Sequence, residues 1–111
     1  MNRIVVFSFL LFLSSEYLFA QQGPAIYQMY CAGCHGAQLQ GNTAAKLIKT
    51  DWKYGRKRDA IWRNIKFGIP TTEMIRWEGT LKDDQIWAVV DYIIKSQETP
   101  PAAVRPRPIL L

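Results

Sequence analysis

Residues 31–35 have the sequence Cys31-Ala32-Gly33-Cys34-His35, a C-x-x-C-H pattern that is the attachment signature of covalently bound haem. Two thiols three positions apart lie on one face of a helical turn, so both can form thioethers with the two vinyl groups of one porphyrin. The imidazole on the next residue then faces the iron. The chain has no other cysteine or histidine, so this motif predicts one haem c.

Other uses of the same residues were weighed against haem. A closed structural zinc site needs four ligands, and the cysteines and the histidine supply three. A thioredoxin-like dithiol follows a strand in a βαβ unit, and no strand-like alternation precedes Cys31. A disulfide between Cys31 and Cys34, or a redox-active thiol pair without haem, stays open, although a disulfide gives His35 no role.

The N-terminus has the pattern of a secretory signal peptide over residues 1–20. Arg3 provides the positive charge, the run from Ile4 to Leu13 is apolar, and cleavage is expected after Ala20. Ten apolar residues are too few to span a bilayer, so we expect no integral membrane span after cleavage. The prediction is a bacterial periplasmic or otherwise exported protein, and an uncleaved N-terminal anchor is the alternative.

The rest of the chain is one small domain, residues 21–99, followed by a Pro/Arg-rich tail, residues 100–111. A domain of this size has a thin core, to which a haem would add a large apolar surface. The formal net charge is +5, but export and the absence of a groove-reading motif argue against nucleic-acid binding. The surplus of positive charge favours electrostatic steering of the protein toward an acidic partner, or it simply keeps the surface of the fold solvated.

The hydrophobic periodicity predicts an all-α fold with three main helices, over residues 24–35, 59–67 and 83–97. Pro24 suits the first turn of the first helix, and Asp59 is expected to cap the second. The third carries a helical apolar stripe, which consists of Ile86, Val89, Val90, Ile93 and Ile94.

Met74 is the predicted second axial ligand of the haem iron. Once the signal peptide is removed the only methionines are Met29 and Met74, and Met29 lies on the same helix as the attachment motif. Met74 lies 39 residues beyond His35, in a loop between two helices. A thioether ligand raises the reduction potential and closes the iron. Without it, the open iron would suit a haem-binding sensor or a peroxidase-like enzyme.

The chain resembles class I c-type cytochromes, which are small exported electron carriers, over nearly all of residues 24–97. The resemblance rests on the attachment motif followed by Gly36, on Gly68-Ile69-Pro70 leading to Met74, and on residues 81–93. It implies the cytochrome c fold, with the first and last helices crossed and loops wrapped around one haem. It also implies a one-electron carrier of a respiratory or dehydrogenase-linked chain that is not itself an enzyme.

Three positions depart from the pattern of this family. Relatives commonly have Gly-Pro-x-Leu after the motif, and the carbonyl of that proline accepts the second ring N–H of the histidine. Here Ala44-Ala45-Lys46-Leu47 occupies the stretch, so the Ala45 carbonyl would have to serve. Ile75 follows Met74 where proline is frequent, and Thr71 stands where glycine is frequent.

Aromatic and basic residues in the middle of the chain are candidates for contacts with the haem and with a partner. We expect Trp52 and Tyr54 to contact the haem, with Arg56 or Arg58 pairing with a propionate. The stretch from Trp52 to Gly55, together with Gly68-Ile69-Pro70, is most similar to cytochromes or cytochrome domains associated with quinoprotein alcohol and sugar dehydrogenases. The expected partners are acidic redox proteins, namely a dehydrogenase, a quinol-oxidising complex or a terminal oxidase, and the chain is expected to be a monomer or a subunit of such a complex. The basic residues are Lys53, Arg56, Lys57, Arg58, Arg63 and Lys66.

Overall fold

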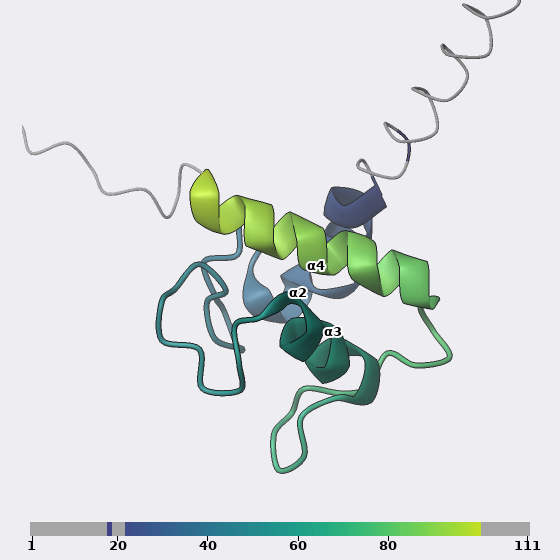
Figure 1. The fold of residues 1–111 in the computed structure, drawn as a ribbon. Coiled ribbons are helices and arrows are strands. Elements are labelled where there is room, and N and C mark those ends of the chain that lie inside the picture. Colours follow the sequence, from purple (N-terminus) through teal and green to yellow (C-terminus); the bar gives the residue numbers. More distant parts are fainter. Residues whose placement is uncertain (1–17, 19–21, 101–111) are drawn as a thin grey trace, which may run out of the picture.

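The computed structural model describes residue 18 and residues 22–100, which form helices joined by long loops (Figure 1). Residues 22–30 are helical, and the named helices that follow are α2 (Ala32–His35), α3 (Arg58–Phe67) and α4 (Asp83–Glu98). The described residues contain no strand, so the prediction of an all-α fold is confirmed. The expected signal peptide and tail lie outside the described residues, apart from Leu18 and Pro100.

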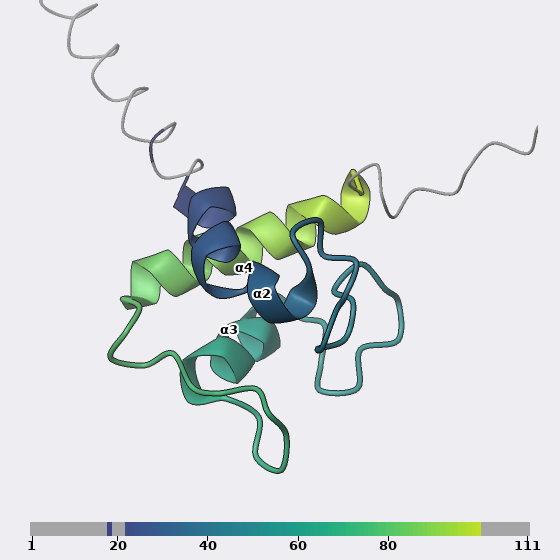
Figure 2. The same ribbon diagram turned by 180° about the vertical axis from the view of Figure 1, so that it is seen from behind.

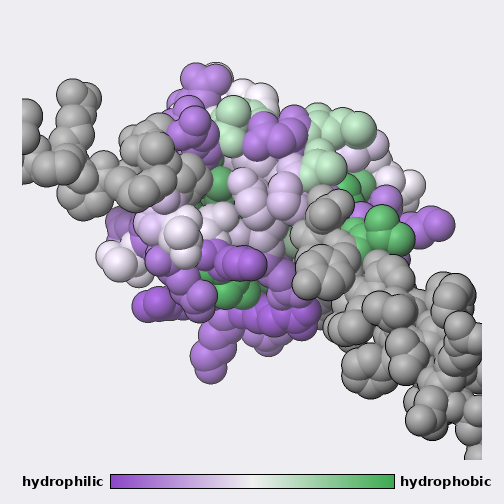
Figure 3. Space-filling model, turned by 90° about the horizontal axis from the view of Figure 1, so that it is seen from above, coloured by the Kyte–Doolittle hydropathy of each residue, from purple (hydrophilic) through white to green (hydrophobic). Residues whose placement is uncertain are grey.

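Helix α4 is the element against which α3 and the helical segment 22–30 pack. It lies across the top of Figure 1 with α2 and α3 beneath it, and Figure 2 shows the helical segment 22–30 against its other side. Its predicted apolar stripe is buried except for Ile94, which is half-buried. Over α4, hydrophobic residues reach the visible surface in separate patches among hydrophilic ones (Figure 3). No helix within residues 22–100 is long and apolar enough to cross a membrane.

The helical segment 22–30 crosses α4 closely because Gly23 has no side chain. A Cβ at Gly23 would collide with the Ala88 carbonyl oxygen and lie 3.0 Å from the Tyr92 Cβ. One turn later, the ring of Tyr27 packs on Tyr92 with centroids 5.3 Å apart. The expected crossing of the first and last helices is therefore present. The ring of Tyr30 packs instead on Trp77, with centroids 5.4 Å apart.

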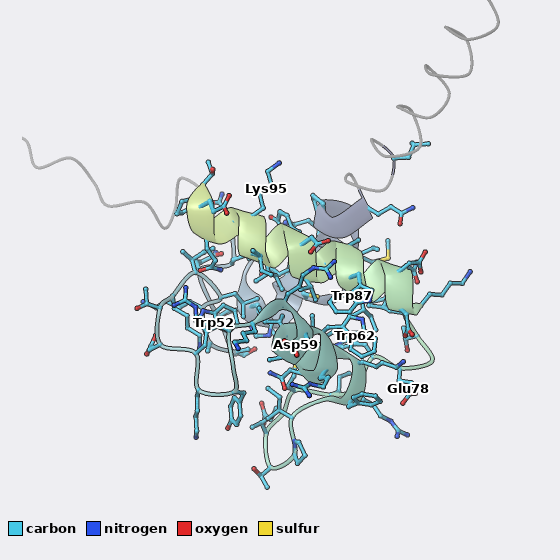
Figure 4. All side chains as sticks on the ribbon, viewed as in Figure 1. Trp52, Asp59, Trp62, Glu78, Trp87 and Lys95 are labelled. Atoms are coloured by element: carbon cyan, nitrogen blue, oxygen red, sulfur yellow. The ribbon has the colours of Figure 1, made fainter. Side chains whose placement is uncertain are left out.

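Helices α3 and α4 run in opposite directions and meet through two stacked indoles. Trp62 and Trp87 lie with ring centroids 5.1 Å apart and nearly parallel, as Figure 4 shows. The Arg58 guanidinium lies over the ring of Trp87, 4.1 Å from its centroid, and binds Asp91 at 2.7 Å. Buried aromatic surface, rather than exposed ion pairs, supplies most of the stabilisation at such a contact.

The helix ends differ from the sequence prediction at four places, one of which is that residues 22 and 23, before the predicted start at residue 24, are already helical. α3 begins at Arg58 with Lys57 at its N-cap, so Asp59 lies in the first turn and does not cap the helix by its side chain. There Asp59 still interacts favourably with the helix dipole. The predicted helix over residues 24–35 is interrupted by a turn at Cys31 and continues as α2. α4 extends one residue beyond residue 97, to Glu98.

Candidate haem site

Of the two thiols of the motif, Cys31 is the N-cap residue of α2 and Cys34 lies within that helix. Cys31 is half-buried and Cys34 is exposed, and both are free thiols. Burial, followed by the charge of the neighbouring Cys34, raises the pKa of the Cys31 thiol to about 11. The backbone N–H of His35 donates to the Cys31 carbonyl at 2.9 Å, so Cys31, Cys34 and His35 share one helical turn.

His35 is oriented by a hydrogen bond to a backbone carbonyl. Its Nδ1 lies 2.8 Å from the Ala45 oxygen. Because a carbonyl oxygen only accepts, the ring must hold its proton on Nδ1, which leaves the lone pair of a neutral imidazole on Nε2. This is the contact that the resemblance assigns to a proline carbonyl, and Ala45 makes it without a proline. The imidazole thus offers a ligand nitrogen in a defined direction.

The chain after α2 folds back on the motif and thereby brings Ala45 to His35. The Gly41 N–H donates to the His35 carbonyl at 2.7 Å, and the Ala44 N–H donates to the Cys34 carbonyl at 2.9 Å. Gly41 has a φ of +91°, a conformation that glycine adopts without strain. These bonds hold the residue before Ala45 against the C-terminal end of the motif.

The loop that carries Met74 is closed by a tight turn. The Thr72 N–H donates to the Ile69 carbonyl at 3.2 Å, with Pro70 and Thr71 between them. The φ of Thr71 is +65°, so the turn has the pattern of type II, whose third position favours glycine. This explains why relatives often have glycine where this chain has Thr71.

The side chain of Thr72 fixes the backbone at Met74. Its Oγ1 donates to the Ile69 carbonyl at 2.7 Å and accepts the Met74 N–H at 3.2 Å. The Met74 carbonyl in turn accepts the Ile69 N–H at 3.1 Å. Met74 is half-buried and packs against the hydrophobic core. The thioether is therefore held on a short, internally bonded loop, at the bottom of Figure 1.

The four predicted haem contacts occupy different surroundings. Trp52 and Arg56 both line a cavity of about 630 Å³, but the Trp52 indole donates to the Lys49 carbonyl at 2.9 Å. Tyr54 is largely exposed, with the Lys53 ammonium 5.2 Å from its ring centroid. Arg58 does not line the cavity, because its guanidinium binds Asp91 and Trp87 between α3 and α4. The structure thus brings two of the four together.

The cavity lies between the loop before α3 and the C-terminal half of α4, well away from Trp62 and Trp87 (Figure 4). Apolar side chains form one part of its wall and cations another. These lining residues are Ile48, Ile61, Ile93 and Ile94, and Lys46, Lys49 and Arg56; the carboxylates of Asp51 and Glu98 line it as well.

The chemistry of the donor set fits a covalent haem. Thioether formation needs two free thiols one turn apart, and iron ligation needs an imidazole whose Nε2 carries the lone pair. Cys31, Cys34 and His35 provide these groups. Among the residues that the structure describes, no three His, Cys, Asp or Glu side chains are arranged to hold a metal ion by themselves.

Sequence reasoning missed several residues that support this arrangement. The buried Tyr27 hydroxyl donates to the Gly36 carbonyl at 2.7 Å and so ties the end of the motif to the preceding helix. Burial, followed by the charges of Cys31 and Tyr92, raises the pKa of Tyr27 well above its usual range. Its position one turn before Cys31 was a usable signal. Thr72 was also accessible, since its side chain bonds only to residues 69 and 74, close by in the sequence. Gln97 gave no signal, because its amide binds the backbone of Leu47 and Lys49, about 50 residues away.

A family profile described as "Cytochrome C oxidase, cbb3-type, subunit III" matches residues 19–93. The chain is 34% identical over 90 residues to the cbb3-type cytochrome c oxidase subunit CcoP of Rhodobacter capsulatus, a match that covers 70% of this chain and 30% of that protein. It is 30% identical over 70 residues to cytochrome c55X of Pseudomonas aeruginosa, covering 63% of this chain and 58% of that one.

A solved structure is also similar to this chain. The c-type cytochrome NirC superposes with a TM-score of 0.59 at 28% identity, and the match covers 73% of this chain and 93% of NirC. The chain thus spans about a third of the CcoP subunits and most of NirC.

Proposed function

The chain belongs to the c-type cytochromes of the cbb3-type oxidase subunit III family, which bind haem c, and we propose that it is an exported monohaem one-electron carrier. When bound, haem c supplies an iron that alternates between the ferrous and ferric states. The protein then has to attach the cofactor, hold the iron ligands and present itself to redox partners.

The observation that carries this proposal is the hydrogen bond from His35 to the Ala45 carbonyl, next to two free thiols. In the proposed holoprotein Cys31 and Cys34 would form the thioethers, and His35 Nε2 would ligate the iron. A fixed imidazole keeps the same ligand orientation in both oxidation states, and the Nδ1–H donor raises the basicity of the ligand. Both effects suit a carrier whose ligands should not rearrange on electron transfer.

Met74 is the proposed second axial ligand. The bonds of Thr72 to Ile69 and Met74 support this role, because they restrict the backbone that presents the thioether. Thioether ligation would close the iron to exogenous ligands and so favours electron transfer over catalysis. Of the four haem contacts predicted from the sequence, we propose Trp52 and Arg56, which line one cavity, as contacts with the haem or its propionates.

The charge distribution supports an acidic redox partner that docks on the loop before α3. The three cations of α3 are paired, Arg58 with Asp91, Arg63 with Asp59 and Lys66 with Asp83. Within the described residues, no ion pair involves the cations of residues 46–57. These unpaired cations are Lys46, Lys49, Lys53, Arg56 and Lys57, and their field would speed encounter with an acidic surface.

The names of the relatives indicate in which electron-transfer chain the protein is best placed. CcoP is by name a subunit of a cbb3-type cytochrome c oxidase, so we place the protein in a respiratory chain that ends in a terminal oxidase. A role as a subunit of such a complex is the second candidate. The association with quinoprotein dehydrogenases stays a prediction from the sequence.

The test is expression of the full chain in bacteria with a cytochrome c maturation system. The carrier proposal expects haem that stays with the chain after denaturation, in the periplasmic fraction, and a reversible one-electron titration. Reduced protein should bind carbon monoxide slowly or incompletely near neutral pH, whereas Met74→Ala should bind it fully. Rapid, full binding by the unchanged protein would favour a sensor or peroxidase-like enzyme, and co-purification in a stoichiometric complex would favour the subunit role.

A further inference from the structure

The Ala45 carbonyl lies in a stretch without proline, so another part of the molecule has to hold it in place. The amide of Gln97, near the C-terminal end of α4, does so by binding the loop on both sides of residue 48. Its Nε2 donates to the Leu47 carbonyl at 2.7 Å, and its Oε1 accepts the Lys49 N–H at 3.2 Å. The second Nε2 hydrogen bonds the Ile93 carbonyl at 3.1 Å, one turn back on α4.

We propose that Gln97 is a positioning residue that keeps the Ala45 carbonyl on His35 Nδ1 and thereby sets the orientation and basicity of the imidazole. The proposal rests on the proposed function, because its effect is read at the haem iron. It assigns a role in tuning the cofactor to a side chain that lies 62 residues from His35 in the sequence.

Ala45 lies between two anchored positions. On one side the Ala44 N–H binds the Cys34 carbonyl at 2.9 Å. On the other side Leu47 is bonded twice, since its N–H donates to the Leu39 carbonyl at 2.9 Å and its carbonyl accepts from Gln97. Releasing Gln97 would leave only the bond to Leu39 at the far anchor, and this looser anchor would let the Ala45 carbonyl turn away from the ring.

The local segment alone does not supply this restraint. Leu39 has a φ of +59° although it is not glycine, and its side chain is fully buried, so the residue that receives the Leu47 N–H is itself strained. Leu47 and Ile48 pack partly against the core, but apolar packing is non-directional and leaves the backbone register free. Beside the bond from the Leu47 N–H to Leu39, the two directional bonds to Gln97 fix that register.

The amide of Gln97 is suited to this task because it donates and accepts at once. A carboxylate would keep the bond from Lys49 but face the Leu47 carbonyl without a proton, and an aliphatic side chain would lose both bonds. The half-buried surroundings make the loss larger than at an exposed site, because the freed backbone groups are poorly solvated.

The experiment compares haem-loaded Gln97→Leu and Gln97→Glu with the unchanged protein. Gln85→Leu is the matched control, since it removes the bond between Gln85 Oε1 and the Lys82 N–H at the opposite end of the same helix. Two readouts are used, the exchange rate of the His35 Nδ1 proton by NMR in the reduced state and the reduction potential. The Glu variant keeps the test possible if the Leu variant loads haem poorly.

We expect the Nδ1 proton to exchange about tenfold faster in both Gln97 variants, the factor that corresponds to about 1.4 kcal/mol. The reduction potential should rise, because a weaker hydrogen bond from Nδ1–H to the Ala45 carbonyl makes the imidazole less basic, and a less basic ligand stabilises the ferric state less. Gln85→Leu should change neither readout. Equal exchange rates and potentials in the Gln97 and Gln85 variants would refute the positioning role while the carrier function stands. Failure of the unchanged protein to attach haem would refute the carrier function, and this proposal with it.

Discussion

Replacing Thr72 by valine tests how strongly the Met74 loop is organised. The substitution is nearly isosteric but removes the oxygen that donates to Ile69 at 2.7 Å and accepts the Met74 N–H at 3.2 Å. Two such bonds would contribute about 1–3 kcal/mol if buried. Thr72 is exposed, so water replaces part of each bond and we take about 1 kcal/mol for the pair.

That energy makes detachment of the thioether about fivefold more favourable in Thr72→Val. The assay is a titration of the ferric holoprotein with imidazole, which competes for the sixth position and reports its availability. The apparent affinity for imidazole should rise about fivefold in Thr72→Val. Thr72→Ser keeps the hydroxyl and should match the unchanged protein.

Two results would refute this reasoning. Equal imidazole affinity in Thr72→Val and Thr72→Ser would mean that the hydroxyl does not restrain Met74. Equal affinity in Met74→Ala and the unchanged protein would mean that Met74 is not the ligand at all. The two outcomes separate the role of the loop from the identity of the ligand.

Three further predictions concern stability and encounter. Gly23→Ala should lower the free energy of unfolding by about 1–3 kcal/mol, seen in denaturant titration, because the new methyl group meets the Ala88 carbonyl; an unchanged midpoint would contradict the close crossing. Burial raises the pKa of Tyr27, so its hydroxyl contributes its full stabilisation below pH 10 and less above pH 10. Above pH 10 the difference in free energy of unfolding between the unchanged protein and Tyr27→Phe should therefore shrink by about 1.4 kcal/mol per pH unit. Parallel curves of stability against pH for the two proteins would contradict this. In stopped-flow measurements at low salt, Lys57→Gln should slow reduction of an acidic partner more than Arg63→Gln does, and equal effects would count against docking on residues 46–57.

Local patterns determined most of the fold and the identity of the candidate ligands. The motif at residues 31–35 needs only adjacent positions to define a haem attachment site, and the apolar stripe of α4 needs only helical periodicity. The helix ends were less accurate, because Lys57 and the backbone bonds around Cys31, not an aspartate cap, decide them.

The supporting contacts were only partly accessible to sequence reasoning. The Ala45 carbonyl could be named in advance, because its position after the motif is local and the chemistry of a carbonyl does not depend on the residue that bears it. The left-handed conformation of Thr71 explains why glycine is frequent at this position in relatives. The sequence showed that Thr71 differs from the family pattern but not why. Arg58 could not be assigned, since its ion pair with Asp91 joins residues 33 positions apart.

The sequence by itself determined the covalent chemistry of this protein, namely two thiols, one imidazole and one candidate thioether at spacings that suit a haem. Only the tertiary structure decided which charges remain unpaired and what holds the ligands still. Asp91 and Asp83 form ion pairs with Arg58 and Lys66 of α3. The Gln97 amide donates a hydrogen bond to the carbonyl of Leu47, 50 residues away. The physical reason is that hydrogen bonds and ion pairs act over a few ångströms, so long-range partners exist only once the packing of α4 has brought them together.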